Sequence, residues 1–250
     1  MLIAYLRRLS GKHRSEAGNR ELGFVLAFIA GAANAGGFLA VSQYTSHMSG
    51  IVSAMADNLA AGDILLMLAG IGAFLSFVAG AACSSILINW ARHRQMESEY
   101  ALPLMVEALL MLCFGLAGGN LARHIGFFVS ITVMLLCFIM GLQNAISSKM
   151  SGGSIRTTHM TGVVTDIGIE LGKLFYWNRT GVRGDPHYVA ANRRKLRTII
   201  ILVSMFFSGG LVGALGFSHI GFSSTIPLAL MLMLLAFEPL AEDLATYLQR

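Results

Sequence analysis

Two stretches of the chain share one pattern. The later one reads Thr157-Thr158-His159-Met160-Thr161-Gly162-Val163-Val164-Thr165-Asp166, and the earlier one reads Thr45-Ser46-His47-Met48-Ser49-Gly50-Ile51-Val52-Ser53. Each copy follows an apolar segment that carries a second shared signature. That segment reads Phe28-Ile29-Ala30-Gly31-Ala32-Ala33-Asn34-Ala35 in the first half and Phe138-Ile139-Met140-Gly141-Leu142-Gln143-Asn144-Ala145 in the second. The order is preserved, so the chain holds an internal repeat, and a repeat must be recognised before single elements are assigned.

The composition is that of an integral membrane protein. Of the 250 residues, 55% are hydrophobic and 12% are charged, whereas soluble domains carry about 25% charged residues. The net charge of +5 does not indicate nucleic-acid binding, because the basic residues gather in loops and near the N-terminus. The predicted fold class is therefore all-α: a polytopic helical membrane protein whose surroundings are the lipid bilayer.

Segments long enough to span the bilayer are easily found, since about 20 helical residues cover a hydrocarbon core of about 30 Å. Two further segments, 49–61 and 161–175, follow the His-Met motifs and are shorter and more polar. If these two dip into the membrane and return, the chain crosses six times; if they span, it crosses eight times. The six long candidates are 22–41, 64–89, 101–119, 125–146, 198–218 and 222–240.

The basic residues favour six crossings. With six, both termini and every Lys and Arg except Arg123 face the cytoplasm, as the positive-inside rule prefers. With eight, the residues that move outside are Arg92, Arg94, Lys149 and Arg156. The preference is not decisive, because most basic residues stay inside in both cases.

Six spans divide into three plus three, and an odd number per repeat inverts one half relative to the other. Inverted repeats with broken helices are a recurring architecture of secondary transporters. We therefore expect a basic cytoplasmic segment 1–21, a first repeat 22–124, and a second repeat 125–250 that includes a basic cytoplasmic loop 176–197.

The His-Met motifs are the candidate substrate site. Their hydroxyl residues are good helix N-caps and their glycines permit close approach. Two short helices that start near the bundle centre would present free N–H groups and positive dipole ends, which suit an anion. The predicted substrate-binding residues are Asn34, Ser46, His47, Ser49, Gly50, Asn144, Thr158, His159, Thr161 and Gly162. The alternative is structural: each His ties down a turn, and each Asn holds the broken backbone.

Ionisable groups inside membrane spans are rare and mark proton or ion pathways. The predicted coupling residues are His47, His159, Asp166 and Glu107. The sequence shows no metal-ligand spacing, no nucleotide-binding loop and no catalytic constellation, so we predict no metal, no cofactor and no enzymatic activity.

The motifs also resemble a known family. Asn34 to Val41, Tyr44 to Gly50, and Arg156-Thr157-Thr158-His159-Met160-Thr161-Gly162-Val163-Val164-Thr165-Asp166-Ile167-Gly168 are similar to the bacterial YoaK family, also called the domain-of-unknown-function 1275 (DUF1275) family. The resemblance runs from about Leu22 to Ala241. It implies a multi-pass protein of the bacterial inner membrane and implies no activity. Ser49 stands where the family pattern has Thr, and the hydroxyl is kept.

Three functions remain open. The first is a small secondary transporter or channel-like carrier for a small, anionic solute or ion, with proton coupling. The second is a membrane enzyme or sensor, which predicts a pocket that is open to one side only and in which His and carboxylate groups converge. The third is an accessory protein that binds a partner through its basic loop. The sequence also leaves room for a homodimer that packs through small-residue faces.

Overall fold

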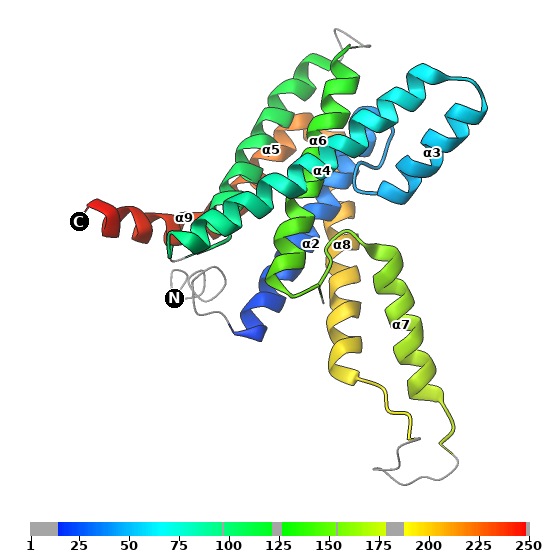
Figure 1. Cartoon of the computed structure of the whole chain (residues 1–250), viewed down its shortest axis with the longest axis vertical. Helices are drawn as coiled ribbons and strands as arrows, with labels where there is room; N and C mark the ends of the chain where they lie inside the picture. Colours follow the sequence, from blue (N-terminus) through cyan, green and yellow to red (C-terminus); the bar gives the residue numbers. More distant parts are fainter. Residues whose placement is uncertain (1–14, 97, 122–126, 154, 179–187, 249–250) are drawn as a thin grey trace.

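The structure is a computed structural model that describes residues 15–96, 98–121, 127–153, 155–178 and 188–248. The regular elements of these residues are all helical, which confirms the all-α class (Figure 1). Residues 1–14, Arg123 and part of the basic loop, 179–187, lie outside the described residues. The elements are α2 (Glu16–Val41), α3 (Met48–Ala60), α4 (Ile64–His93), α5 (Ala101–Leu121), α6 (Phe127–Met150), α7 (Met160–Phe175), α8 (Arg193–Ile220), a 3-10 turn η1 (Gly221–Ser224) and α9 (Thr225–Leu248).

Helices α2 and α6, which carry the two Phe-Ile-x-Gly-x-x-Asn-Ala signatures, form an antiparallel central pair. At one end of the pair, the Asn19 amide donates to the main-chain oxygen of Met150 over 3.2 Å. Further along, the Gln143 amide donates to the oxygen of Leu26 over 3.0 Å. Because residue numbers rise on one helix as they fall on the other, the first helices of the two halves run in opposite directions.

Each central helix also packs against the long helix of the other half. On α2, a Cβ at Gly31 would overlap the main-chain oxygen of Phe206 in α8, and a Cβ at Gly36 would overlap the ring of Phe217. Residue numbers rise together along this contact, so α2 and α8 are parallel. The same holds for α6 and α4, where Gly72 lies against Met134 and Lys149 donates to Asn89 over 3.0 Å.

The two long-helix contacts match each other residue by residue. Gly31 and Gly209 lie against the oxygens of Phe206 and Phe28, and Gly141 and Gly80 lie against those of Phe77 and Phe138. Phe77–Gly80 therefore corresponds to Phe206–Gly209. The contacts fix this register, which the sequence leaves open because phenylalanine and glycine are each doubled, at Phe206-Phe207 and Gly209-Gly210.

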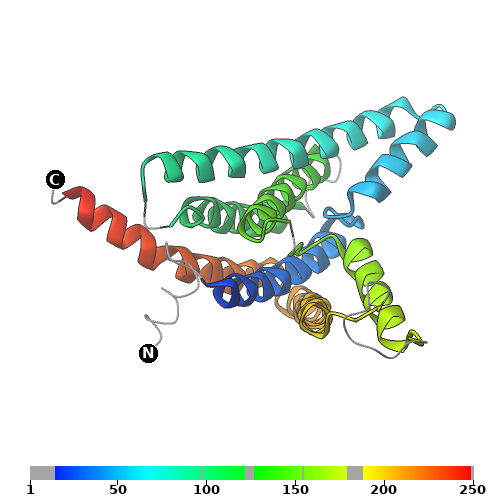
Figure 2. The same ribbon diagram turned by 60° about the horizontal axis from the view of Figure 1, so that its bottom comes forward.

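These directions show what the short helices do. Helix α2 is antiparallel to α6, and α6 is parallel to α4, so α2 and α4 are antiparallel. Helix α3, which connects them, therefore returns the chain to the end of the bundle where α2 finished. The same argument applies to α7 between α6 and α8. Figures 1 and 2 show α3 and α7 lying outside the central pair, each beside the long helix that follows it.

The return after α2 begins at Ser42, whose N–H bonds to the oxygen of Phe38 and whose φ of 53° lies in the left-handed region. This conformation ends the helix and reverses the chain direction. Short polar side chains then start the long helices: Asp63 accepts from the Leu66 N–H over 3.1 Å, and Asn192 accepts from the Lys195 N–H over 2.9 Å.

Within the described residues, four helical stretches are long and apolar enough to cross a membrane: Glu16–Val41, Ile64–His93, Ser130–Met150 and Arg193–Ala245. The last stretch has 53 residues and contains α8, η1 and α9. A shorter apolar stretch, Ala101–Leu116, belongs to α5. The central stretches on α2 and α6 are 50% and 56% buried, against 11% for the one on α4. Helix α4 therefore leaves most of its apolar surface to face lipid.

Candidate functional site

Equivalent hydrogen bonds join the segments before α3 and α7 to the central helices that precede them. The Ser46 hydroxyl donates to Asn34 Oδ1 over 2.9 Å, and the Thr158 hydroxyl donates to Asn144 Oδ1 over 2.6 Å. The four residues occupy equivalent places in the two halves. This bond supports the structural interpretation of the asparagines: each amide holds the returning chain against the helix it has just left.

The expected N-caps are not the ones that the structure uses. Helices α3 and α7 begin at Met48 and Met160, so His47 and His159 occupy the N-cap positions, and neither helix receives a side-chain cap. Ser46 and Thr158 are bonded to the asparagines instead, and Ser49 and Thr161 lie inside the first turn. Uncapped helix starts keep main-chain N–H groups for another acceptor.

Each histidine ring folds back over the first turn of its own helix. A Cβ on Gly50 would overlap the His47 ring, and a Cβ on Gly162 would come within 2.6 Å of His159 Nδ1. The glycine of His-Met-[Ser/Thr]-Gly is therefore explained by the ring that covers it. Both rings are exposed, and His159 Nδ1 lies 3.4 Å from a guanidinium nitrogen of Arg156.

The two motifs open onto different cavities, and no residue lines both. Figures 1 and 2 show the starts of α3 and α7 near each other beside the central pair, so the expected meeting of the two helix starts stays a prediction, although both histidine rings are exposed rather than buried. The cavity at the second motif, of about 750 Å³, lies between the starts of α2, α7 and α8, and we call it the basic cavity. The cavity at the first motif, of about 920 Å³, lies between α3, α4 and α6, and we call it the apolar cavity.

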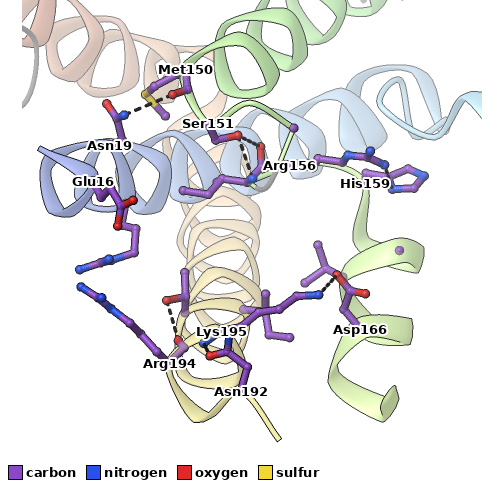
Figure 3. A pocket seen from close by; sticks show the side chains of 17 residues that line it. Glu16, Asn19, Met150, Ser151, Arg156, His159, Asp166, Asn192, Arg194 and Lys195 are labelled. Carbon is purple, nitrogen blue, oxygen red and sulfur yellow. Dashed lines mark hydrogen bonds and ion pairs between the residues drawn. The ribbon is translucent and has the colours of Figure 1, made fainter. Parts of the chain in front are cut away.

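Charged side chains from several elements line the basic cavity (Figure 3). Lys195 reaches from α8 to Asp166 on α7, with 3.1 Å between Nζ and Oδ2. Arg194 extends the other way, toward Glu16 on α2, and Arg156 points to His159. The charged lining residues are Arg20, Arg156, Arg194 and Lys195 against Glu16 and Asp166. The lining of the apolar cavity contains no Asp, Glu, Lys or Arg.

Glu170, one helical turn after Asp166, anchors the connection between α7 and α8. Its carboxylate accepts from Lys173 Nζ over 2.9 Å and from the Asn192 N–H over 2.6 Å. The hydrogen bond from Lys173 and the bond from the Asn192 backbone hold the pKa of Glu170 below its usual value. This carboxylate is a positioning group for the start of α8.

The depressed pKa of Glu170 predicts a pH dependence. Its stabilising effect is fully present above the unfolded-state pKa of about 4.3 and is lost as the pH falls through the lower folded-state value. Glu170→Gln is therefore expected to lower the melting temperature in detergent at pH 7, with the difference from the parent shrinking below about pH 4. An equal difference at pH 7 and pH 3 would contradict this assignment.

Glu107, on α5, lines neither of the two cavities. It is fully buried in the main apolar core beside Leu104, Ala108 and Met111, and neither carboxyl oxygen has a hydrogen-bond partner among the described residues. Of the four predicted coupling residues, Asp166 and His159 line the basic cavity, His47 lines the apolar cavity, and Glu107 stands alone. In the described part of the chain, no group of three His, Cys, Asp or Glu side chains could hold a metal ion.

Sequence reasoning missed the cavity residues supplied from outside the motifs. Arg194 and Lys195 belong to the expected basic cytoplasmic loop 176–197, yet both line the basic cavity. Gln143 was part of a signature and is fully buried, with its amide bonded across the central pair. The available signal was position: Arg194 and Lys195 correspond to Leu65 and Leu66, so charge replaces leucine at equivalent places in the repeat.

The family model described as "Protein of unknown function (DUF1275)" matches residues 22–237. No curated protein and no solved structure matches the chain. The matched range contains both His-Met motifs and the whole lining of the apolar cavity, while Glu16, Asn19 and Arg20 of the basic cavity lie before it. The chain therefore belongs to the DUF1275 family, and the YoaK label fits this domain.

Proposed function

We propose that this protein is a small secondary transporter for a small anionic solute, with both His-Met motifs in its transport pathway. The observation that carries the proposal is the duplicated broken segment. In each half, a hydroxyl–asparagine hydrogen bond ties the start of an uncapped short helix to one helix of the central pair. Each of these helix starts lines a cavity of its own. The structure has one cavity at each motif. Two such cavities suit a solute pathway that is reached from both sides of the membrane, whereas an enzyme or sensor needs a pocket open to one side only.

The topology that we propose has six spans, α2, α4, α5, α6, α8 and α9, in two inverted repeats. The directions of the helices support this topology. Helix α3 returns the chain to the end of the bundle at which α2 finishes, and α7 returns it to the end at which α6 finishes. Basic residues near the starts of α2 and α8 support a topology in which the basic cavity faces the cytoplasmic side of a bacterial inner membrane and both termini are inside. Dimerisation stays a prediction; the glycines at the helix crossings already make contacts within one chain.

Glu107 is the proposed proton-coupling group, because a buried carboxyl without a hydrogen-bond partner inside a span marks a proton path. Glu107→Gln keeps the shape of the side chain and removes its titration. We expect this variant to fold and to bind solute, while its flux no longer rises with an imposed proton gradient. Glu99→Gln is the control, because Glu99 pairs with Arg92 over 2.7 Å outside the proposed spans. Gradient-driven flux that survives Glu107→Gln would remove Glu107 from the mechanism.

The test of the proposed function is flux in reconstituted liposomes. A panel of radiolabelled anions (chloride, acetate, sulfate and phosphate) is offered with and without a pH gradient. At least one anion should accumulate, and His47→Ala and His159→Ala should each reduce its flux at least tenfold, because each ring lies at one of the two helix starts. His219→Ala serves as control, since that ring bonds to the Leu215 oxygen at the end of α8. No flux of any anion, or equal flux in the double His variant, would contradict the proposal.

A further inference from the structure

The two cavities are equivalent in the repeat but opposite in polarity. The crossing contacts pair Gly80 with Gly209, so Leu65 and Leu66 at the start of α4 correspond to Arg194 and Lys195 at the start of α8. All four of these residues line a cavity. The positive-inside rule accounts for basic residues on the proposed cytoplasmic side, so this polarity decides only which of the two matching cavities can attract an anion.

The charges of the basic cavity are not balanced internally. Its lining carries four cationic side chains against two carboxylates, an excess of two positive charges. The Lys195–Asp166 pair joins side chains that are 43% and 42% exposed, and ion pairs this exposed to solvent are weak. An entering anion can therefore displace Asp166 from Lys195 at little cost.

The remaining groups fit an oxyanion. Arginine forks and helix N-termini bind phosphate-type groups through several N–H donors at once. Arg156 and the uncapped start of α7 lie on one side of the cavity, beside His159, and Lys195 reaches in from α8 (Figure 3). A phosphate group carries about 1.5 to 2 negative charges at pH 7, which matches the excess.

We propose that the basic cavity binds a phosphate-type oxyanion, with Arg156, Lys195 and the start of α7 as its contacts and Asp166 as the internal competitor. This rests on the proposed transport function and narrows its substrate class. The same chemistry is present in free phosphate and in the headgroup of an anionic phospholipid, so the test has one arm for each. The apolar cavity offers no such site and serves as the exit side of the same pathway.

The first arm measures binding of inorganic phosphate to the full chain in a neutral detergent by titration calorimetry at constant ionic strength. Lys195→Met should weaken binding at least tenfold, and Asp166→Asn should tighten it about threefold to tenfold because the competitor loses its charge. Arg194→Gln removes a positive charge from the cavity lining and should weaken binding. Its matched control is Arg197→Gln, which removes the same charge outside the lining and should leave binding unchanged. Binding unchanged by Lys195→Met, or weakened by Asp166→Asn, would overturn the proposal.

The second arm titrates phosphatidylglycerol into the same micelles. If free phosphate fails to bind but the lipid binds and loses affinity in Lys195→Met, the phosphate group comes from a headgroup. If neither binds with this dependence on Lys195, the proposal is wrong. Failure of the transport function looks different: phosphate binds as expected but no anion crosses the liposome. Conversely, flux of another anion with no phosphate binding would keep the carrier and reject this substrate class.

Discussion

Gly31→Val and Gly141→Val are each expected to destabilise the protein by about 3 kcal/mol, the upper part of the usual range for overpacking. A Cβ at either position overlaps the main-chain oxygen of Phe206 or Phe77, and a backbone atom cannot rotate away as a side chain can. The helices must separate, which also loosens the contacts of the central pair. Unfolding in mild detergent, followed by circular dichroism, measures the effect.

Gly168→Val is the matched control. Gly168 is also helical, on α7, and a Cβ there meets nothing within 4 Å. Helix propensities of Val and Gly differ little, so the change should stay within about 0.5 kcal/mol. The two crossing variants should fall by similar amounts because their contacts are equivalent. A crossing variant as stable as Gly168→Val would show that the long helices do not pack as described.

Asn144→Leu is expected to cost about 1–3 kcal/mol, because it leaves the Thr158 hydroxyl without the acceptor that it now reaches over 2.6 Å. Thr158→Val removes the same bond from the other side. The double variant should therefore be less destabilised than the sum, with a coupling energy of about 1 kcal/mol. Asn34→Leu with Ser46→Ala is the equivalent pair in the first half and should behave alike.

Thr165→Val is the control for the Thr158 change. The Thr165 hydroxyl donates to the Thr161 oxygen within its own helix turn, over 2.9 Å, so its loss should have little effect. In the transport assay, Asn144→Leu should also reduce flux, because the start of α7 is no longer held against α6. Strictly additive stabilities in the double variant would mean that the Asn144–Thr158 bond does not anchor the turn.

The sequence predicts the helical segments well because repeated apolar patterns and repeated polar motifs are strong local signals. Each of the eight expected helical segments is present, and the short segments after the two His-Met motifs are separate helices, α3 and α7. The bounds differ by a few residues because helices continue past the apolar run into polar ends, as α8 does when it begins at Arg193.

What the sequence could not predict depends on distance. Ser46 and Thr158 look like N-caps because cap patterns are local, yet their real partners lie 12 and 14 residues upstream on the central helices. The two motifs line different cavities because the central pair is antiparallel, and the direction of that pair cannot be read from either motif alone. The basic cavity joins α2, α7 and α8, and charges on three elements cannot be assigned to one cavity before the fold is known.

In the proposed topology, α3 and α7 each return the chain to the side of the membrane at which the preceding helix ends. The direct measurement is accessibility of single cysteines at Ala61, Arg94 and Arg193, in a chain whose Cys83, Cys113 and Cys137 are replaced by alanine, to a membrane-impermeant thiol reagent in intact cells. We expect Arg94→Cys and Arg193→Cys to be protected from the reagent until the cells are broken, and Ala61→Cys to be labelled in intact cells. If Arg94→Cys and Arg193→Cys instead lie on opposite sides, the short helices cross the membrane, and the inverted repeat and its two-sided pathway are wrong.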